Sequence, residues 1–124
     1  MAPAAEEQKI IQRVKKGLKD IYRSKKMFFL LAETFQALGD SSRIQIVWAL
    51  SQGELAVGTL AEVLEMSQPA VSHHLRTLRN LKLVRVRKEG RTSFYSLDDE
   101  HIEELLGAGI EHVEDLMKRG IGTN

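Results

Sequence analysis

The 124-residue chain contains no cysteine. This absence excludes disulfide bonds, thiolate metal ligands, cysteine nucleophiles and thiol-based redox switching. Long apolar runs are also absent, so no segment approaches the length that would span a membrane, and residues 1–26 lack the hydrophobic stretch of a signal peptide. We therefore expect a cytoplasmic protein without membrane contact.

Apolar residues make up 43% of the chain and charged residues 28%, which is an ordinary balance for a globular protein. A chain of this length can build one hydrophobic core and is short for two. We therefore predict a single domain over residues 1–124.

The formal net charge of +1 conceals an uneven distribution of charge along the chain. Lysine and arginine outnumber aspartate and glutamate by 8 to 3 in residues 1–26 and by 7 to 1 in residues 67–91. Acidic residues dominate by 5 to 1 in residues 27–66 and by 8 to 2 in residues 98–124. The first block fits an exposed amphipathic helix, whereas the central basic block indicates a surface for a polyanion. The acidic end indicates either a surface for cations or an acidic exterior.

Helical spacing of apolar residues predicts two helices at the start of the chain, over residues 10–21 and 28–38. Gly39 is a usual helix end, and Asp40 is suited to cap a third helix that ends at Gly53. One face of this third helix should pack in the core: Ile44, Val47, Trp48 and Leu50.

Residues 57–81, VGTLAEVLEMSQPAVSHHLRTLRNL, predict a helix-turn-helix. A short helix runs to Leu64, and a tight turn follows at Glu65 and Met66. Ser67 is suited to cap the second, longer helix, because its hydroxyl can accept a hydrogen bond from a free backbone N–H.

Residues 84–97, VRVRKEGRTSFYSL, start with alternating apolar and polar side chains, turn around Glu89 and Gly90 and return, which predicts a β-hairpin. A last helix is predicted over residues 99–119. A helix-turn-helix followed by a basic hairpin is the pattern of a winged helix. The predicted fold class is therefore mainly α with a β-hairpin wing, a winged helix-turn-helix.

The second helix of the motif presents a polar face suited to DNA. Val71, Leu75 and Leu78 share the other face and must pack inward. The polar face carries side chains whose lengths and donors suit base edges and phosphates in a major groove. With the basic residues of the hairpin, the predicted DNA-binding set is Ser67, Gln68, Ser72, His73, Arg76, Arg79, Arg87, Lys88 and Arg91.

Two other functions are compatible with parts of this pattern. A winged helix can bind proteins instead of DNA, although the excess of six positive charges over residues 67–91 argues against that use. Ser72 and His73 could be taken for a nucleophile and its base, but neighbouring helical residues point about 100° apart and no third orienting group is evident. We therefore expect no enzyme, with His73 exposed and His74 half-buried.

Residues 98–115, DDEHIEELLGAGIEHVED, carry two histidines, each with a carboxylate nearby. On a helix that rises about 1.5 Å per residue, His101 and His112 lie about 16 Å apart, whereas the ligands of one Zn²⁺ lie within about 4 Å of each other. One helix therefore cannot bind one ion through both. The interval is nevertheless close to three full turns, so both histidines share a stripe with Leu105 and Ala108.

Two copies of this helix, packed antiparallel about a two-fold axis near residues 106–107, would form a homodimer through this stripe. The His101 end of one chain would then meet the His112 end of the other. Gly107 and Gly109 would permit close approach at the crossing, and the N-terminal helix would lie beside it. The apolar seam between the helices would consist of Ile102, Leu105, Leu106, Ile110, Val113, Leu116 and Met117.

Each end of this helix pair supplies its own carboxylate. Asp99 lies two residues before His101 at the helix start, and Asp115 lies three residues after His112 on the same face. Two imidazoles and two carboxylates form a plausible tetrahedral set for Zn²⁺, and two-fold symmetry requires two such sites per homodimer. The alternative is that the carboxylates are solvated and the histidines only flank a dimer seam.

The stretch from about Leu31 to Lys118 resembles the ArsR/SmtB family of bacterial metal-sensing winged-helix repressors. The resemblance is carried by LGDSSRIQIVWAL, ELAVGTLAEVL, SQPAVSHHLRTLRNLKLVRVRKEGRTSFYSL and DDEHIEELL. It implies a homodimeric repressor that binds palindromic double-stranded operator DNA and leaves this DNA when metal binds.

One subgroup of this family has a metal site on the C-terminal helix, patterned Asp-x-His, then ten residues, then His-x-x-Glu or His-x-x-His. The chain matches the first three of these ligands and has a shorter aspartate in the last place. The implied metal ligands are Asp99, His101, His112 and Asp115, with Glu111 or Glu114 as substitutes for Asp115.

The chain departs from many relatives at a second, thiolate-rich site. They carry a cysteine in ELCVGDLA, where this chain reads ELAVGTLA with Ala56 and Thr59. Nitrogen and oxygen ligands point to Zn²⁺ as the effector, with Co²⁺ close behind, and away from Cu(I), Cd²⁺, As(III) and Pb²⁺. Ni²⁺ fits less well, because it favours six ligands and the N-terminal segment has no histidine. The prediction is a Zn²⁺-inhibited repressor, with a metal-independent repressor and a protein-interaction module as alternatives.

Overall fold

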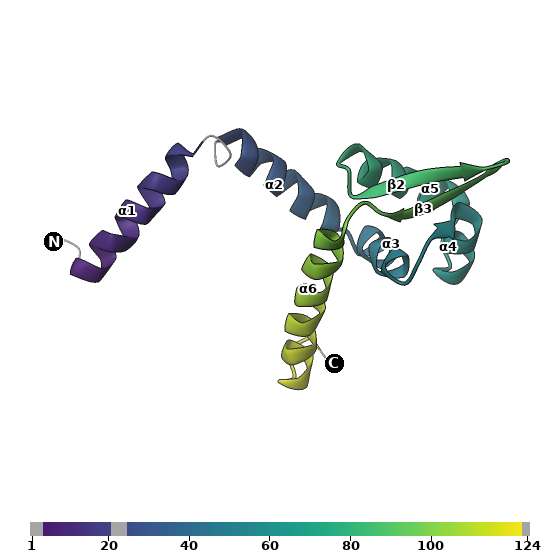
Figure 1. The fold of residues 1–124 in the computed structure, drawn as a ribbon. Helices are drawn as coiled ribbons and strands as arrows, with labels where there is room; N and C mark the ends of the chain where they lie inside the picture. Colours follow the sequence, from purple (N-terminus) through teal and green to yellow (C-terminus); the bar gives the residue numbers. More distant parts are fainter. Residues whose placement is uncertain (1–3, 21–24, 123–124) are drawn as a thin grey trace. The chain divides into compact units, whose positions relative to one another are not determined.

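The structure of the protein is a computed structural model that describes residues 4–20 and 25–122. The chain divides into two compact units, one up to Gln36 and the other from Ala37 onward (Figure 1). No helix in these described ranges is long and apolar enough to cross a membrane. A single domain over residues 1–124 with terminal dimerisation helices remains a prediction.

The first helix of the structure, α1 (Ala5–Lys19), lies in the first unit where the apolar spacing predicts a helix. Acidic residues occupy its first turn and basic residues its last turn, which is favourable to the helix dipole. None of its residues is buried, and Ile10, Val14 and Leu18 are between 46% and 57% exposed. The predicted extension to Ile21 lies outside the described residues. α1 thus presents an apolar stripe to solvent.

The second helix, α2 (Lys25–Leu38), is also predicted from its apolar spacing and passes from the first unit into the second. Its end belongs to the core of the second unit, where Ala37 is 3% exposed. The earlier turns carry exposed aromatic side chains, which are Phe28, Phe29 and Phe35.

The helix-turn-helix region of the second unit contains the three predicted helices. Figure 1 shows them gathered beside the β-sheet. They are α3 (Ser41–Ser51), α4 (Val57–Val63) and α5 (Gln68–Asn80).

The ends of these helices are fixed by the predicted caps and turn. Asp40 caps α3 by accepting a hydrogen bond from the backbone N–H of Arg43 at 3.0 Å, and this bond lowers the pKa of the Asp40 carboxyl. Ser67 caps α5, because its hydroxyl accepts a hydrogen bond from the N–H of Ala70 at 3.2 Å. Between α4 and α5, Glu65 has a φ of 54°, a left-handed conformation that reverses the chain within a tight turn.

A three-stranded antiparallel sheet completes the winged helix. In order across the sheet its strands are β1 (Leu55–Ala56), β3 (Thr92–Leu97) and β2 (Val84–Glu89). β2 and β3 form the predicted hairpin, but the turn is Gly90–Arg91, because Glu89 still pairs with Thr92. Gly90 has a φ of +63°, which glycine adopts without a Cβ clash. β1 was not predicted, since two residues are too few to show alternation.

The core of the second unit lies among α3, α4, α5 and the base of the sheet. The predicted core position of Trp48 is wrong, because this side chain is 49% exposed. At about 100° per residue, Trp48 lies about 200° around α3 from Ile46, opposite the arc that Ile46, Val47 and Leu50 bury. The largest fully buried side chains are Ile46, Leu60, Leu75, Leu78, Val47, Val71 and Val84.

The last helix, α6 (Glu100–Lys118), joins the core only near its start. Ile102 is 5% exposed and is the only buried residue of α6, and Leu106 packs partly against the core. These two residues therefore belong to the core of their own chain, rather than to the predicted seam between two chains. The predicted seam residues that are between 42% and 51% exposed are Leu105, Val113 and Met117.

Leu75→Ala should destabilise the fold strongly, because Leu75 is 0% exposed at the centre of the core and its loss leaves a cavity. We expect the free energy of unfolding to fall by about 2–5 kcal/mol in urea titrations at one protein concentration. Val63→Ala is the control, since Val63 is 60% exposed and should change stability by at most about 0.5 kcal/mol. Equal effects of the two substitutions would contradict the described core.

Candidate nucleic-acid interface and metal half-sites

The outward face of α5 brings together most of the side chains predicted to contact DNA. Burial of Val71, Leu75 and Leu78 fixes the rotation of this helix about its axis. Ser67 lies at its N-terminus, where its hydroxyl already serves as the cap. The side chains left exposed along α5 are Gln68, Ser72, His73, Arg76 and Arg79.

A hollow of about 320 Å³ lies between α5 and β3 and is lined by Ser72, Arg76, Arg79, Asn80 and Tyr95. Guanidinium, hydroxyl and amide groups provide the donors that phosphates and base edges accept. Sequence reasoning missed Asn80 and Tyr95. The alternation along β3 could have placed Tyr95 on the face toward α5, whereas Asn80 at the end of a helix gives no comparable signal.

The three predicted wing cations are all exposed, but they do not form one group. Arg87 and Lys88 are neighbours on β2 and therefore lie on opposite faces of the sheet, while Arg91 lies in the turn. Arg87 already has acidic partners, because its Nη2 donates to Glu54 at 2.7 Å and its Nη1 donates to Glu89 at 2.7 Å. Only Lys88 and Arg91 remain wing cations for which the structure records no acidic partner within these described strands.

The ion pair between Arg87 and Glu54 changes the pKa of both groups. The hydrogen bond from Arg87 lowers the pKa of the Glu54 carboxyl, and the hydrogen bonds to Glu54 and then Glu89 raise the pKa of Arg87. The side chains of Arg87 and Glu54 are 51% and 35% exposed, so solvent screens their attraction. The pair is therefore charged at neutral pH and modest in energy.

His73 and His74 lie as predicted, the first exposed and the second half-buried. Their rings meet edge to face with centroids 5.7 Å apart. Nδ1 of His74 is buried and accepts or donates no hydrogen bond within the described part of the chain. His74 thus lies inside the packing of α5, and His73 is left to the solvent-facing row.

Asp99 and His101 form the first predicted half-site at the start of α6. Asp99 is the N-cap of the helix, because its Oδ1 accepts a hydrogen bond from the backbone N–H of His101 at 2.9 Å. The same oxygen lies 3.4 Å from Nδ1 of His101. The side chains of His101 and Asp99 are 79% and 49% exposed, so both are accessible to an ion.

His112 and Asp115 form the second predicted half-site and are exposed further along the same helix. Because α6 is unbroken, His101 and His112 lie about 16 Å apart. Across residues 4–20 and 25–122, no three histidine, aspartate or glutamate side chains are grouped so that they could hold a metal. The imidazole and carboxylate donors suit Zn²⁺ in type, but one chain does not bring a complete set together.

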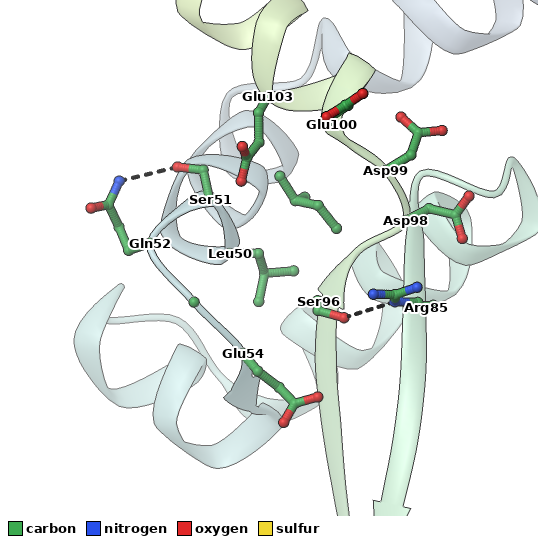
Figure 2. A pocket seen from close by; sticks show the side chains of 12 residues that line it. Leu50, Ser51, Gln52, Glu54, Arg85, Ser96, Asp98, Asp99, Glu100 and Glu103 are labelled. Atoms are coloured by element: carbon green, nitrogen blue, oxygen red, sulfur yellow. Dashed lines mark hydrogen bonds between the residues drawn. The ribbon is translucent and has the colours of Figure 1, made fainter.

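An acidic hollow of about 350 Å³ lies beside the first half-site, between the end of α3, the sheet and the start of α6 (Figure 2). Arg85 also lines it, and its Nε donates to the hydroxyl of Ser96 at 3.3 Å. The concentration of negative charge favours cations near the start of α6. The carboxylates that line the hollow are Glu54, Asp98, Asp99, Glu100 and Glu103.

Comparison with known proteins places the helix-turn-helix and β2 in a known family. Residues 40–86 match the model of the bacterial regulatory proteins of the arsR family. The chain is 38% identical over 109 residues to a cadmium resistance transcriptional regulatory protein, a CadC homolog of Staphylococcus aureus, and the match covers 87% of this chain and 88% of the relative. The chain belongs to the ArsR family.

Other members of the ArsR family extend this comparison. A transcriptional repressor of Synechocystis, an SmtB homolog, is 42% identical over 85 residues, which cover 68% of this chain and 64% of the relative. A homodimeric winged helix-turn-helix DNA-binding domain from Mycobacterium bovis superposes with a TM-score of 0.68 at 30% identity, covering 78% of this chain and 89% of that domain. The predicted winged-helix fold and family are confirmed, and the protein is a DNA-binding transcriptional regulator rather than an enzyme.

Glu54→Gln should destabilise the protein in a pH-dependent way. Because the pKa of Glu54 is lowered in the folded protein, its ion pair stabilises the fold fully above the ordinary glutamate pKa of about 4.3, and this contribution is lost as the pH falls through the folded value. We expect Glu54→Gln to lower the free energy of unfolding near pH 7 and to have a smaller effect near pH 3. Urea titrations at both pH values measure this difference, and equal effects would contradict the ion pair.

Proposed function

We propose that the protein is a homodimeric transcriptional repressor that leaves a palindromic operator when Zn²⁺ binds between the α6 helices of its two subunits. The observation that carries the proposal is the pair of half-sites on α6. Each has an exposed imidazole with a carboxylate close by in sequence, and the helix holds the two too far apart for one ion. A second subunit is the simplest way to complete each set.

DNA binding is assigned to the exposed face of α5 and to the wing. Gln68, Ser72 and His73 have the lengths and polar groups to contact base edges in a major groove. The cations around them would bind phosphates, which provide affinity without sequence preference. These phosphate-binding side chains are Arg76, Arg79, Lys88 and Arg91, with the N-cap Ser67 beside the same backbone.

The homodimer is assigned to α6 because this helix leaves its apolar side chains uncovered. A Cβ added at Gly107 or at Gly109 would meet no other atom within 4 Å, so the backbone is open to close approach at this point. Exposed apolar side chains along one face of a helix indicate an interface. The basic, amphipathic α1 has the opposite charge to α6 and would pack beside this seam. The apolar side chains of α6 available to a partner are Leu105, Val113 and Met117.

The proposed metal ligands are Asp99 and His101 from one subunit with His112 and Asp115 from the other, and Glu111 or Glu114 remain substitutes for Asp115. When bound, Zn²⁺ supplies four-coordinate crosslinking through nitrogen and oxygen donors. Co²⁺ accepts the same set, whereas the lack of cysteine argues against a soft metal. The name of the staphylococcal relative refers to cadmium, which supports a response to metal but not this choice of ion.

Release from DNA would follow from a change in the spacing of the two α5 helices. Successive major grooves on one side of DNA are about 34 Å apart, so a homodimer binds its palindrome only when both recognition helices match that spacing. Ligands drawn from both subunits fix the angle between the α6 helices. Because Ile102 attaches α6 to the core that carries α5, a fixed angle between the α6 helices constrains the α5 spacing.

Arg76→Ala should weaken binding to the promoter of the protein's own gene and reduce its dependence on salt. Each lost phosphate contact lowers the slope of log affinity against log salt by about 0.9, and a symmetric homodimer loses two. Gln68→Ala should instead narrow the difference between promoter and random DNA while the slope stays unchanged. Fluorescence anisotropy over a salt series measures both.

Arg85→Ala is the matched control for this experiment, because it removes the same charge from the opposite face of the sheet, where Arg85 donates to Ser96. Its salt slope should equal that of the unmodified protein. An unmodified protein whose DNA affinity does not respond to salt would sink the proposed DNA-binding surface.

Mixing two defective chains should restore one zinc site. Homodimers of His101→Ala and of His112→Ala should each lose tight zinc binding at both sites, because every site takes half its ligands from each subunit. In the mixed heterodimer one site has all its ligands and the other lacks both histidines. We expect one tight Zn²⁺ per purified heterodimer and two per unmodified homodimer. If the heterodimer binds none, the ligands are wrongly paired.

Asp99→Asn separates the two roles of Asp99. Asparagine caps a helix about as well as aspartate, so the stability of α6 should be retained. The loss of the carboxylate should still weaken zinc binding and raise the zinc concentration that releases DNA. If zinc titration leaves the DNA complex of the unmodified protein intact, the protein is a metal-independent repressor.

A further inference from the structure

Arg87 is the most extensively bonded cation in the described part of the wing. Its Nη2 lies 2.7 Å from Oε1 of Glu54, and its Nε lies 3.2 Å from both oxygens of the same carboxylate. Its Nη1 lies 2.7 Å from Oε2 of Glu89. The guanidinium also stacks on Phe94, with Cζ 4.9 Å from the ring centroid. Three different side chains therefore fix one guanidinium.

These contacts cross all three strands of the sheet. Phe94 on the middle strand pairs with Ala56 of β1 on one side and with Arg87 of β2 on the other. Glu54 is two residues before Ala56, and residues two apart on a strand share a face. Tyr95 and the hollow beside α5 lie on the opposite face. The ion pair thus ties the body of the domain to the wing on the side away from the proposed DNA-contacting groups.

The geometry points to Arg87 as a positioning residue: its ion pair with Glu54, across Phe94, holds the wing at the angle at which Lys88 and Arg91 reach the DNA backbone. This inference rests on the proposed DNA binding and removes Arg87 from the predicted phosphate contacts. Arg87, Glu54 and Glu89 together carry one positive and two negative charges, which repel a phosphate.

The wing needs such a tie because little else holds its outer half. At its base, Val84 and Leu97 are buried in the core. Beyond them the side chains of β2 are mostly exposed, and β1 contributes only two residues to the sheet. A two-stranded hairpin is marginally stable by itself, so its direction depends on contacts along its length. Glu54 supplies one of these contacts from outside the hairpin.

The test compares the signs of two effects on DNA binding, measured with a duplex containing the promoter of the protein's own gene. Glu54→Gln removes a negative charge, so long-range electrostatics alone would tighten the complex. If the pair positions the wing, Glu54→Gln should weaken binding, as Arg87→Gln does. The double variant should lose no more affinity than either single variant, because both changes break one contact.

The salt dependence separates positioning from direct contact. Arg91→Gln should lower the slope of log affinity against log salt by about 0.9 per phosphate, whereas Arg87→Gln should leave the slope unchanged. Amide hydrogen exchange in residues 87–92 should be faster in Glu54→Gln, with the same rates as the unmodified protein in α5. This readout needs no DNA.

Two results would overturn the inference: a salt slope for Arg87→Gln that falls as far as that for Arg91→Gln, or tighter DNA binding by Glu54→Gln. Unchanged hydrogen exchange in the wing of Glu54→Gln would overturn it as well. A failure of the proposed function looks different, because the unmodified protein would then bind the duplex without a salt response, whatever happens in the variants.

Discussion

Burial of one face of α5 is the constraint on which the DNA-binding surface depends. Val71, Leu75 and Leu78 have no exposed surface, and each turn of the helix adds one or two of them to the same core. A rotation of α5 about its axis would expose these side chains at a cost of several kcal/mol, at about 1.5–3 kcal/mol each. The polar row from Gln68 to Arg79 therefore has one direction available, and the wing must be arranged around it.

The second subunit is the other requirement that the fold imposes. α6 is attached to its own chain through Ile102 and partly through Leu106, while most of its length stays exposed. α1 carries an apolar stripe with no buried residue. Soluble proteins seldom leave two such helices uncovered, so association provides stability as well as the geometry of a palindrome. The proposed zinc ligands lie on the helix that most needs a partner.

Sequence patterns predicted the elements whose cause is local. The caps Asp40 and Ser67, the buried face of α5 and the hairpin all follow from residue type and periodicity over a few neighbours. Trp48 failed because a hydrophobic residue next to a core position was assigned to the core, although helical geometry turns it away. The pairing of Arg87 with Glu54 could not be read from the sequence, because 33 residues separate the two and β1 is too short to predict.

The attachment of α6 at Ile102 has a mechanical consequence. About 24 Å of helix extends from Ile102 to Lys118 with no other fully buried residue among the described ones. A tilt about this single fixed point moves the far end of α6 by several times the displacement at its start, and it leaves the close-packed interior of the domain undisturbed. The angle between two subunits can therefore change at little cost in core packing, as a switch between two dimer geometries requires.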